Sequence, residues 1–181
     1  MTYFINLLSF SRIALAVAIS ILLIIKDAYF ISLILFLIAG ISDYFDGLLA
    51  RKYNATSEIG EILDPIADKI LIIFVLITLS VNLSSFLLAF GASIIISREI
   101  WVSALRDFSA RNNIVNSTKV TYLAKVKTSI QLLTIFIYLF ALSADIMILI
   151  IIADISLIIS VLITMYTGYE YTINVINEKK L

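Results

Sequence analysis

The sequence predicts an all-α integral membrane protein with six transmembrane helices. Of its 181 residues, 62% are hydrophobic and only 14% are charged, and the mean hydropathy is +1.10. A soluble domain of this length has about half its residues apolar and a quarter charged. The charged residues also gather in short clusters between long apolar runs. We therefore expect residues 1–181 to form a single membrane domain.

The first segment, residues 1–12, mixes apolar and polar residues and ends in Arg12, which is typical of a short interfacial helix. A signal peptide is the competing interpretation, but no small-residue cleavage site follows and further apolar segments do. Six spans are then predicted, each near the roughly 20 residues that cross a bilayer as a helix. They are residues 8–25, 29–51, 59–80, 86–108, 121–142 and 146–170.

Two features interrupt the apolar runs. Between Ile70 and Ser97 no charged residue occurs, and polar residues around Asn82 and Ser85 predict a hairpin turn there. Asp154 interrupts the sixth span. We expect its side chain to face the helix bundle or the far interface, without a catalytic role.

Lys and Arg residues set the predicted orientation. If both chain ends lie on one side, twelve of the thirteen Lys and Arg residues lie on that side and only Lys26 lies on the other. The excess of positive charge on cytoplasmic loops then places both termini in the cytoplasm. No soluble domain and no nucleic-acid partner are expected.

The chain has no Cys and no His. Zinc-thiolate sites, disulfides and thiolate nucleophiles are therefore excluded. A general base must be a carboxylate, a Lys or a Tyr.

Four aspartates form the strongest candidate site. Asp43 and Asp46 are three residues apart, and Asp64 and Asp68 are four apart, so each pair lies within about 60° on one helix face. Two antiparallel helices can bring all four carboxylates together. Such charge near lipid is costly unless divalent cations or cationic partners neutralise it, and oxygen-only ligands suit Mg2+ or Mn2+. The alternative is two separate helix-end clusters that face water.

Several apolar runs, such as Ile13–Ile25 and Ala28–Ser42, are shorter than a bilayer. The charges at their cytoplasmic ends then need a polar cavity open to the cytoplasm. A lipid entering from the leaflet and a second substrate from the cytoplasm can meet there, which favours an enzyme of lipid metabolism. The alternative is a divalent-cation transporter, but the outer halves of the spans are almost entirely apolar.

The aspartates belong to the longer pattern D-x2-D-G-x2-A-R-x8-G-x3-D-x3-D, which begins at Asp43 and ends at Asp68. This pattern resembles the signature of the CDP-alcohol phosphatidyltransferases. The segment Asn6-Leu7-Leu8-Ser9 with Arg12 is similar to the family's N-terminal segment, although Ser9 stands where Thr is usual. Residues 98–106 and 125–128 resemble a bacterial branch of the family that uses glycerol 3-phosphate.

The resemblance implies transfer of a phosphatidyl group from CDP-diacylglycerol to glycerol 3-phosphate, with release of CMP, at the bacterial cytoplasmic membrane. Inositol phosphate, serine or phosphatidylglycerol are the alternative acceptors. It also implies a homodimer and two Mg2+ or Mn2+ ions. Asp43 and Asp64 would bridge both ions, Asp46 would complete one site, and Asp68 would contact the other ion and accept a proton as the catalytic base.

The resemblance also implies a set of residues that bind the CDP-lipid. Each has a simpler explanation from the sequence alone: small residues pack helices, an Arg anchors a span at the cytoplasmic surface, and a Ser caps a helix. The set comprises Asn6, Ser9, Gly47, Ala50, Arg51, Ser57 and Gly60.

A second set of residues predicts the acceptor pocket. Arg98 and Arg106 lie eight residues apart on the fourth span, within about 80° of each other, and Lys125 and Lys127 begin the fifth. Such a cluster suits an acceptor that carries a phosphate; the alternative assigns these residues to the membrane surface. Arg98 lies a dozen residues into its span and needs a partner there, either Glu99 or the acceptor phosphate. The sixth span carries no part of this pattern.

Overall fold

The computed structural model describes residues 2–25, 28–53, 58–112 and 122–179, and these residues form six α-helices. Each of the six predicted spans corresponds to one of these helices, with boundaries that differ by a few residues at most ends. The helices are α1 (Thr2–Ile24), α2 (Tyr29–Tyr53), α3 (Glu58–Asn82), α4 (Phe86–Arg111), α5 (Tyr122–Ala144) and α6 (Met147–Lys179).

The predicted short interfacial helix does not exist as a separate element. Residues 2–24 form one continuous helix, because they contain neither Gly nor Pro to interrupt it. The largest extension is in α6, which runs to Lys179 and has 33 residues. At about 1.5 Å per residue it is close to 50 Å long, well beyond the hydrocarbon core of a bilayer.

The predicted hairpin between α3 and α4 is confirmed. Ser84 has a φ of 48°, and Ser85 caps α4 by accepting a hydrogen bond from the backbone N–H of Leu88. The turn between α5 and α6 also contains a residue of positive φ, Asp145 at 56°. Pro65 lies inside α3, and the helix continues through it.

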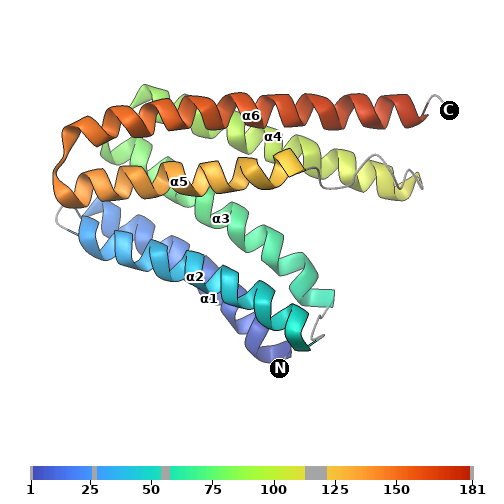
Figure 1. Cartoon of the computed structure of the whole chain (residues 1–181), viewed down its shortest axis with the longest axis horizontal. Coiled ribbons are helices and arrows are strands. Elements are labelled where there is room, and N and C mark those ends of the chain that lie inside the picture. The colour runs from blue at the N-terminus through green and yellow to red at the C-terminus, as the bar shows by residue number, and fades with distance from the viewer. Residues whose placement is uncertain (1, 26–27, 54–57, 113–121, 180–181) are drawn as a thin grey trace.

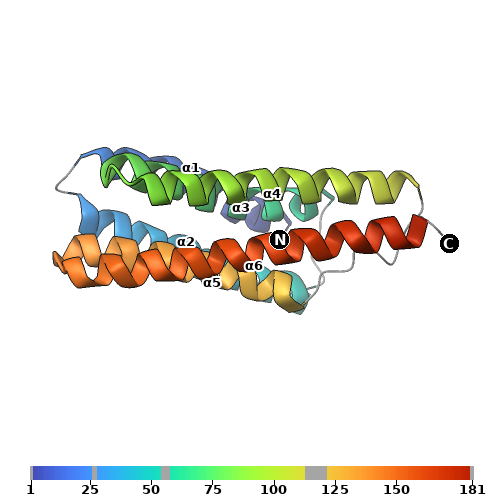
Figure 2. The ribbon, with the colours of Figure 1, turned by 90° about the horizontal axis from the view of Figure 1, so that it is seen from above.

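The helices form two layers of three, as Figure 2 shows from above. One layer contains α1, α3 and α4, and the other contains α2, α5 and α6. Within the layers α1 packs on α3, and α5 packs on α6; between them α1 contacts α2, and α4 contacts α6. In Figure 1, α1, α2 and α3 spread away from α4, α5 and α6 towards the right, where the chain-terminal ends of α1 and α6 also point.

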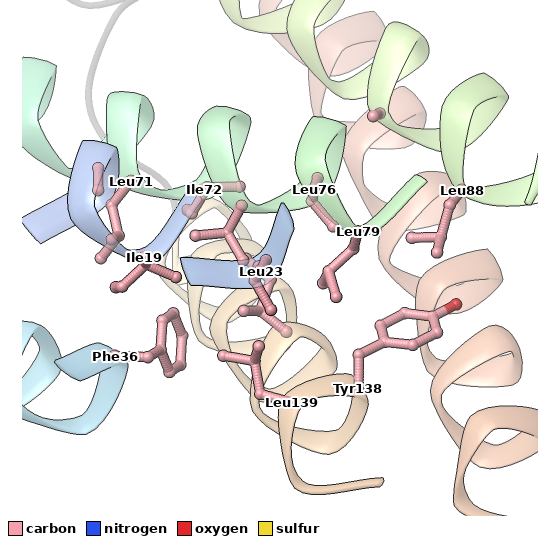
Figure 3. Close-up of a cluster of buried hydrophobic side chains, with 14 of the residues drawn as sticks. Ile19, Leu23, Phe36, Leu71, Ile72, Leu76, Leu79, Leu88, Tyr138 and Leu139 are labelled. Carbon is pink, nitrogen blue, oxygen red and sulfur yellow. The ribbon is translucent and has the colours of Figure 1, made fainter. Parts of the chain in front are cut away.

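The core lies where the layers stay close together (Figure 3). Ile19 and Leu23 of α1 are fully buried against α3, whose Leu76 and Leu79 point into the same cluster, and Tyr138 of α5 reaches it from the other layer. This core anchors one end of the bundle, so the opposite ends of the helices are free to diverge around a cavity.

Four helices are long and apolar enough to cross a membrane, as judged from the described residues: α1, α4, α5 and α6. In α2 the apolar stretch is shorter, Tyr29–Phe45. Large apolar side chains cover the outside of the bundle, including Phe86 and Val81, which are 83% and 70% exposed. This surface is that of an integral membrane protein; the count of six spans stays a prediction.

Polar side chains link α5 and α6 inside the bundle. The hydroxyl of Tyr138 donates to Asp154 Oδ1 at 2.5 Å, and Thr134 shares a hydrogen bond of 2.7 Å with Ser156. Asp154 therefore faces the bundle, as one of the two predictions had it. The interior of the bundle is more polar than the apolar outer halves of the spans suggested. The polar groups of each pair bond to each other across the two helices, as is usual where helices pack in membranes.

Candidate active site

Arg12 lies at the centre of the aspartate cluster. Its Nη1 lies 2.7 Å from Asp43 Oδ1 and 2.5 Å from Asp68 Oδ1, and its Nη2 lies 3.3 Å from Asp64 Oδ1. The Arg12 side chain is 1% exposed, whereas the three carboxylates are 37–49% exposed. One buried cation from α1 therefore contacts three of the four predicted carboxylates, one from α2 and two from α3. Over the described residues, the helices α2 and α3 do not pack on each other, and both pack on α1.

A second side chain of α1 contacts the same cluster. The hydroxyl of Ser9 donates to Asp64 Oδ1, and Ser9 is fully buried. Ser9 and Arg12 lie three residues apart and so on one face of α1, the face that packs against α3. The packing of α1 on α3 thus brings Ser9 and Arg12 to the carboxylates of Asp64 and Asp68.

Asp43 and Asp68 line a cavity of about 400 Å3 between the diverging helices. Asp43 enters it from α2, Asp68 and Lys69 from α3, and Glu99 from α4, while Thr128 and Ser129 enter from α5. Three of the four predicted acceptor-binding residues also line it: Arg98, Arg106 and Lys127. The cavity thus places basic groups beside the aspartates, as the sequence predicted.

Glu99 connects the basic side chains of this cavity. Its Oε1 lies 3.0 Å from Arg98 Nη1 and also accepts a hydrogen bond from Lys127 Nζ, and its Oε2 lies 3.6 Å from Lys69 Nζ. Lys69 also donates to Ser103 Oγ at 2.9 Å. Cations from α3, α4 and α5 therefore meet at one carboxylate, and Glu99 is a partner of Arg98 as one of the two expectations had it.

Tyr171 of α6 was not predicted and contacts both arginines of the cavity. It is 2% exposed, and its ring centroid lies 5.7 Å from Arg98 Cζ and 5.3 Å from Arg106 Cζ. Arg98 Nη2 also donates to Thr167 Oγ1, one turn earlier on α6, at 2.9 Å. A Tyr four residues after a Thr does not by itself predict contacts with arginines. These contacts follow only from the packing of α6 on α4.

Several predicted residues cannot be placed. Ser57 lies outside the described residues, and for the others the helix is described but the side chain is not: Asn6, Asp46, Gly47, Ala50, Arg51 and Lys125. Gly60 is buried in the first turn of α3. Asp154 lies against Tyr138 and away from this site.

The residues present fit a divalent metal in their chemistry. Three carboxylates converge on one positively charged group, and oxygen-only donors suit a hard cation. Among the described residues no three Asp or Glu side chains are arranged to hold a metal ion directly. The cation that they surround in this structure is the Arg12 guanidinium.

The family model for the CDP-alcohol phosphatidyltransferases matches residues 3–170. The chain belongs to this family. It is therefore a transferase enzyme. Members of this family generally use divalent metal ions. Membership also sets aside the alternative of a divalent-cation transporter.

Curated relatives share one name, CDP-diacylglycerol–glycerol-3-phosphate 3-phosphatidyltransferase. The relative from Wigglesworthia glossinidia brevipalpis is 39% identical over 146 residues, which are 81% of this chain and 79% of the relative. The relative from Blochmanniella floridana is 48% identical over 102 residues, 56% of this chain and 54% of the relative. The Haemophilus influenzae relative is 38% identical over 111 residues, 61% and 60% of the two chains.

Proposed function

We propose that this enzyme transfers the phosphatidyl group of CDP-diacylglycerol to glycerol 3-phosphate, releasing CMP and forming phosphatidylglycerophosphate. The observation that carries the proposal is the shared cavity, whose lining includes Asp43 and Asp68 together with Arg98, Arg106 and Lys127. The names of the relatives support the choice of both substrates. The basic side chains favour an acceptor that bears a phosphate over one that is uncharged.

In the proposed reaction Asp68 acts as the general base. A hydroxyl of glycerol 3-phosphate gives its proton to the Asp68 carboxylate, and its oxygen bonds to the lipid-side phosphorus of CDP-diacylglycerol. The bond from that phosphorus to the bridging oxygen of the pyrophosphate breaks, and CMP leaves with the electron pair. Holding the two substrates in line supplies most of the rate, as is usual for phosphoryl transfer.

The residues around Asp68 have separate tasks in this proposal. Arg12 and Ser9 hold the carboxylates of α2 and α3 towards one another. Arg98, Arg106 and Lys127 bind the acceptor phosphate, with Lys125 as a fourth member of the set. The CDP-lipid is bound by the other predicted set: Asn6, Ser9, Gly47, Ala50, Arg51, Ser57 and Gly60.

Two Mg2+ or Mn2+ ions are proposed, held by Asp43, Asp46, Asp64 and Asp68, and they would neutralise the charge that builds on the leaving phosphate. We also propose that the chain crosses the bacterial cytoplasmic membrane six times, with the cavity and both termini on the cytoplasmic side. By resemblance to its family it forms a homodimer.

CMP release from the purified protein tests this function. The protein is incubated with CDP-diacylglycerol and Mg2+ or Mn2+, and each of glycerol 3-phosphate, inositol phosphate, serine and phosphatidylglycerol is offered in turn. We expect CMP release with glycerol 3-phosphate, and its loss when EDTA is present. Release with another acceptor but not with glycerol 3-phosphate would contradict the proposal.

A further inference from the structure

The two arginines of the cavity are held by α6, a helix to which the sequence assigned no role. This helix is longer than a membrane span needs, and it packs along α4 (Figure 1). Its residues Thr167, Gly168 and Tyr171 all contact Arg98, and Tyr171 also contacts Arg106. We call these three α6 residues the arginine cradle.

Tyr171 contacts both guanidinium groups at once. Its buried ring lies within 6 Å of each, at 5.7 Å from Arg98 Cζ and 5.3 Å from Arg106 Cζ, and its hydroxyl accepts a hydrogen bond of 3.2 Å from Arg106 Nη2. A cation over an aromatic ring is attracted by the ring's quadrupole, and the attraction is stronger where water is excluded. Tyr171 therefore favours one arrangement of two long side chains that are eight residues apart on α4.

Gly168 and Thr167 restrict Arg98 further. A Cβ atom at position 168 would lie 3.0 Å from Arg98 Cγ, so any other residue there would require Arg98 to shift by a few tenths of an ångström. Thr167 Oγ1 accepts a hydrogen bond from Arg98 Nη2, and Thr167 is fully buried. The aliphatic part and Nη2 of Arg98 thus contact α6, and its Nη1 donates a hydrogen bond to Glu99.

We propose that Tyr171 is a positioning residue that presets Arg98 and Arg106 for the phosphate of the acceptor. Arg side chains lose considerable rotamer entropy when a ligand fixes them. A pair that is already fixed loses less on binding, so the affinity for a small alcohol carrying a phosphate monoester rises. The inference rests on the proposed function, since it concerns the acceptor pocket of the same site.

Steady-state kinetics of Tyr171→Leu and Tyr171→Phe test this inference. We expect Tyr171→Leu to raise the KM for glycerol 3-phosphate about tenfold, since two preset side chains become mobile. The inhibition constant of inorganic phosphate, measured as a competitor of glycerol 3-phosphate, should rise to a similar extent. The KM for CDP-diacylglycerol should change less than about twofold. Tyr171→Phe keeps the ring and should restore most of the affinity for both anions.

Two further variants separate positioning from folding. Gly168→Ala keeps the Tyr171 ring and requires Arg98 to shift by a few tenths of an ångström. We expect this variant to raise the KM for glycerol 3-phosphate alone. Tyr169→Leu is the matched control, because Tyr169 is 67% exposed on the same turn, and it should leave both KM values unchanged. If Tyr171→Leu does not fold, Gly168→Ala still gives the answer.

The outcomes distinguish this inference from the function on which it rests. No CMP release by the unsubstituted enzyme with glycerol 3-phosphate would overturn the proposed function. Normal release, combined with unchanged or equally raised KM values for the two substrates in Tyr171→Leu and Gly168→Ala, would overturn only the role of Tyr171. If Tyr171→Phe raises the KM for glycerol 3-phosphate as much as Tyr171→Leu does, the role of the ring is overturned.

Discussion

Arg12 Nη1 lies 2.5 Å from Asp68 Oδ1, although the two residues are 56 positions apart in the chain. The same nitrogen donates to Asp43 at 2.7 Å. A buried guanidinium from the first helix thus lies between acidic groups of the second and third. Without this positive charge, the carboxylates would repel one another.

Arg12→Ala should therefore destabilise the protein and impair its activity. Removing the guanidinium takes away hydrogen bonds to carboxylates that are 37–49% exposed, so we expect a loss of about 1.5–3 kcal/mol of unfolding free energy. Misplaced carboxylates should also lower CMP release by about 100-fold. Thermal unfolding in detergent and the CMP assay measure the two effects. Arg111→Ala is the control, because its ion pair with Asp107 is exposed and contributes less than about 1 kcal/mol.

Asp68→Asn should remove turnover and leave CDP-lipid binding measurable. An amide cannot accept the proton of the acceptor hydroxyl, and loss of a general base costs on the order of 10²–10⁴ in rate. CMP release and equilibrium binding of labelled CDP-diacylglycerol separate the two properties. Asp107→Asn, on the exposed part of α4, should retain full activity. Near-normal turnover in Asp68→Asn would place the base elsewhere.

Arg106→Ala should weaken the binding of the acceptor far more than the binding of the lipid. A hydrogen bond to a charged group contributes about 1.5–3 kcal/mol, so the KM for glycerol 3-phosphate should rise about tenfold or more. The KM for CDP-diacylglycerol should stay within about twofold. Equal effects on the two constants would count against an acceptor pocket at Arg106. Arg111→Ala, whose side chain is 77% exposed, provides the comparison.

Tyr138→Phe should lower stability without changing the chemistry. The variant removes the donor to Asp154, which then lacks its 2.5 Å hydrogen bond inside the bundle. Such bonds between membrane helices contribute about 0.6–2 kcal/mol, so a small fall in melting temperature is expected. Tyr166→Phe, at a 59% exposed position of α6, should change neither property. Loss of CMP release from a folded Tyr138→Phe protein would show that Asp154 affects the active site.

The acidic half of the site could be predicted from the sequence. The spacings of Asp43, Asp46, Asp64 and Asp68 predict helix faces, and the structure brings Asp43, Asp64 and Asp68 to one group, the Arg12 guanidinium of α1. The contact of Arg12 with these aspartates could not be predicted in this way. A single Arg near the end of a span is as consistent with a surface anchor as with a buried partner, and only the contact of α1 with α3 decides between them.

The basic half was predicted in part. Arg98 and Arg106 stand out because charge inside a span needs a reason, whereas Thr167, Gly168 and Tyr171 are ordinary residues of an apolar helix. Their contacts depend on the pairing of α4 with α6, which local sequence does not encode. The prediction of a separate interfacial helix was wrong for another reason: residues 2–24 contain neither Gly nor Pro, so one helix runs through them without a break.

The two-layer packing has a consequence for biosynthesis. During translation the aspartate cluster can assemble once α1, α2 and α3 have left the ribosome, because Arg12, Asp43 and Asp68 all belong to these helices. The arginine cradle belongs to α6, which is synthesised after these three helices. A nascent chain can therefore form the contacts of Arg12 with the aspartates first, and Arg98 and Arg106 gain their contacts with Thr167 and Tyr171 only after α6 has been translated.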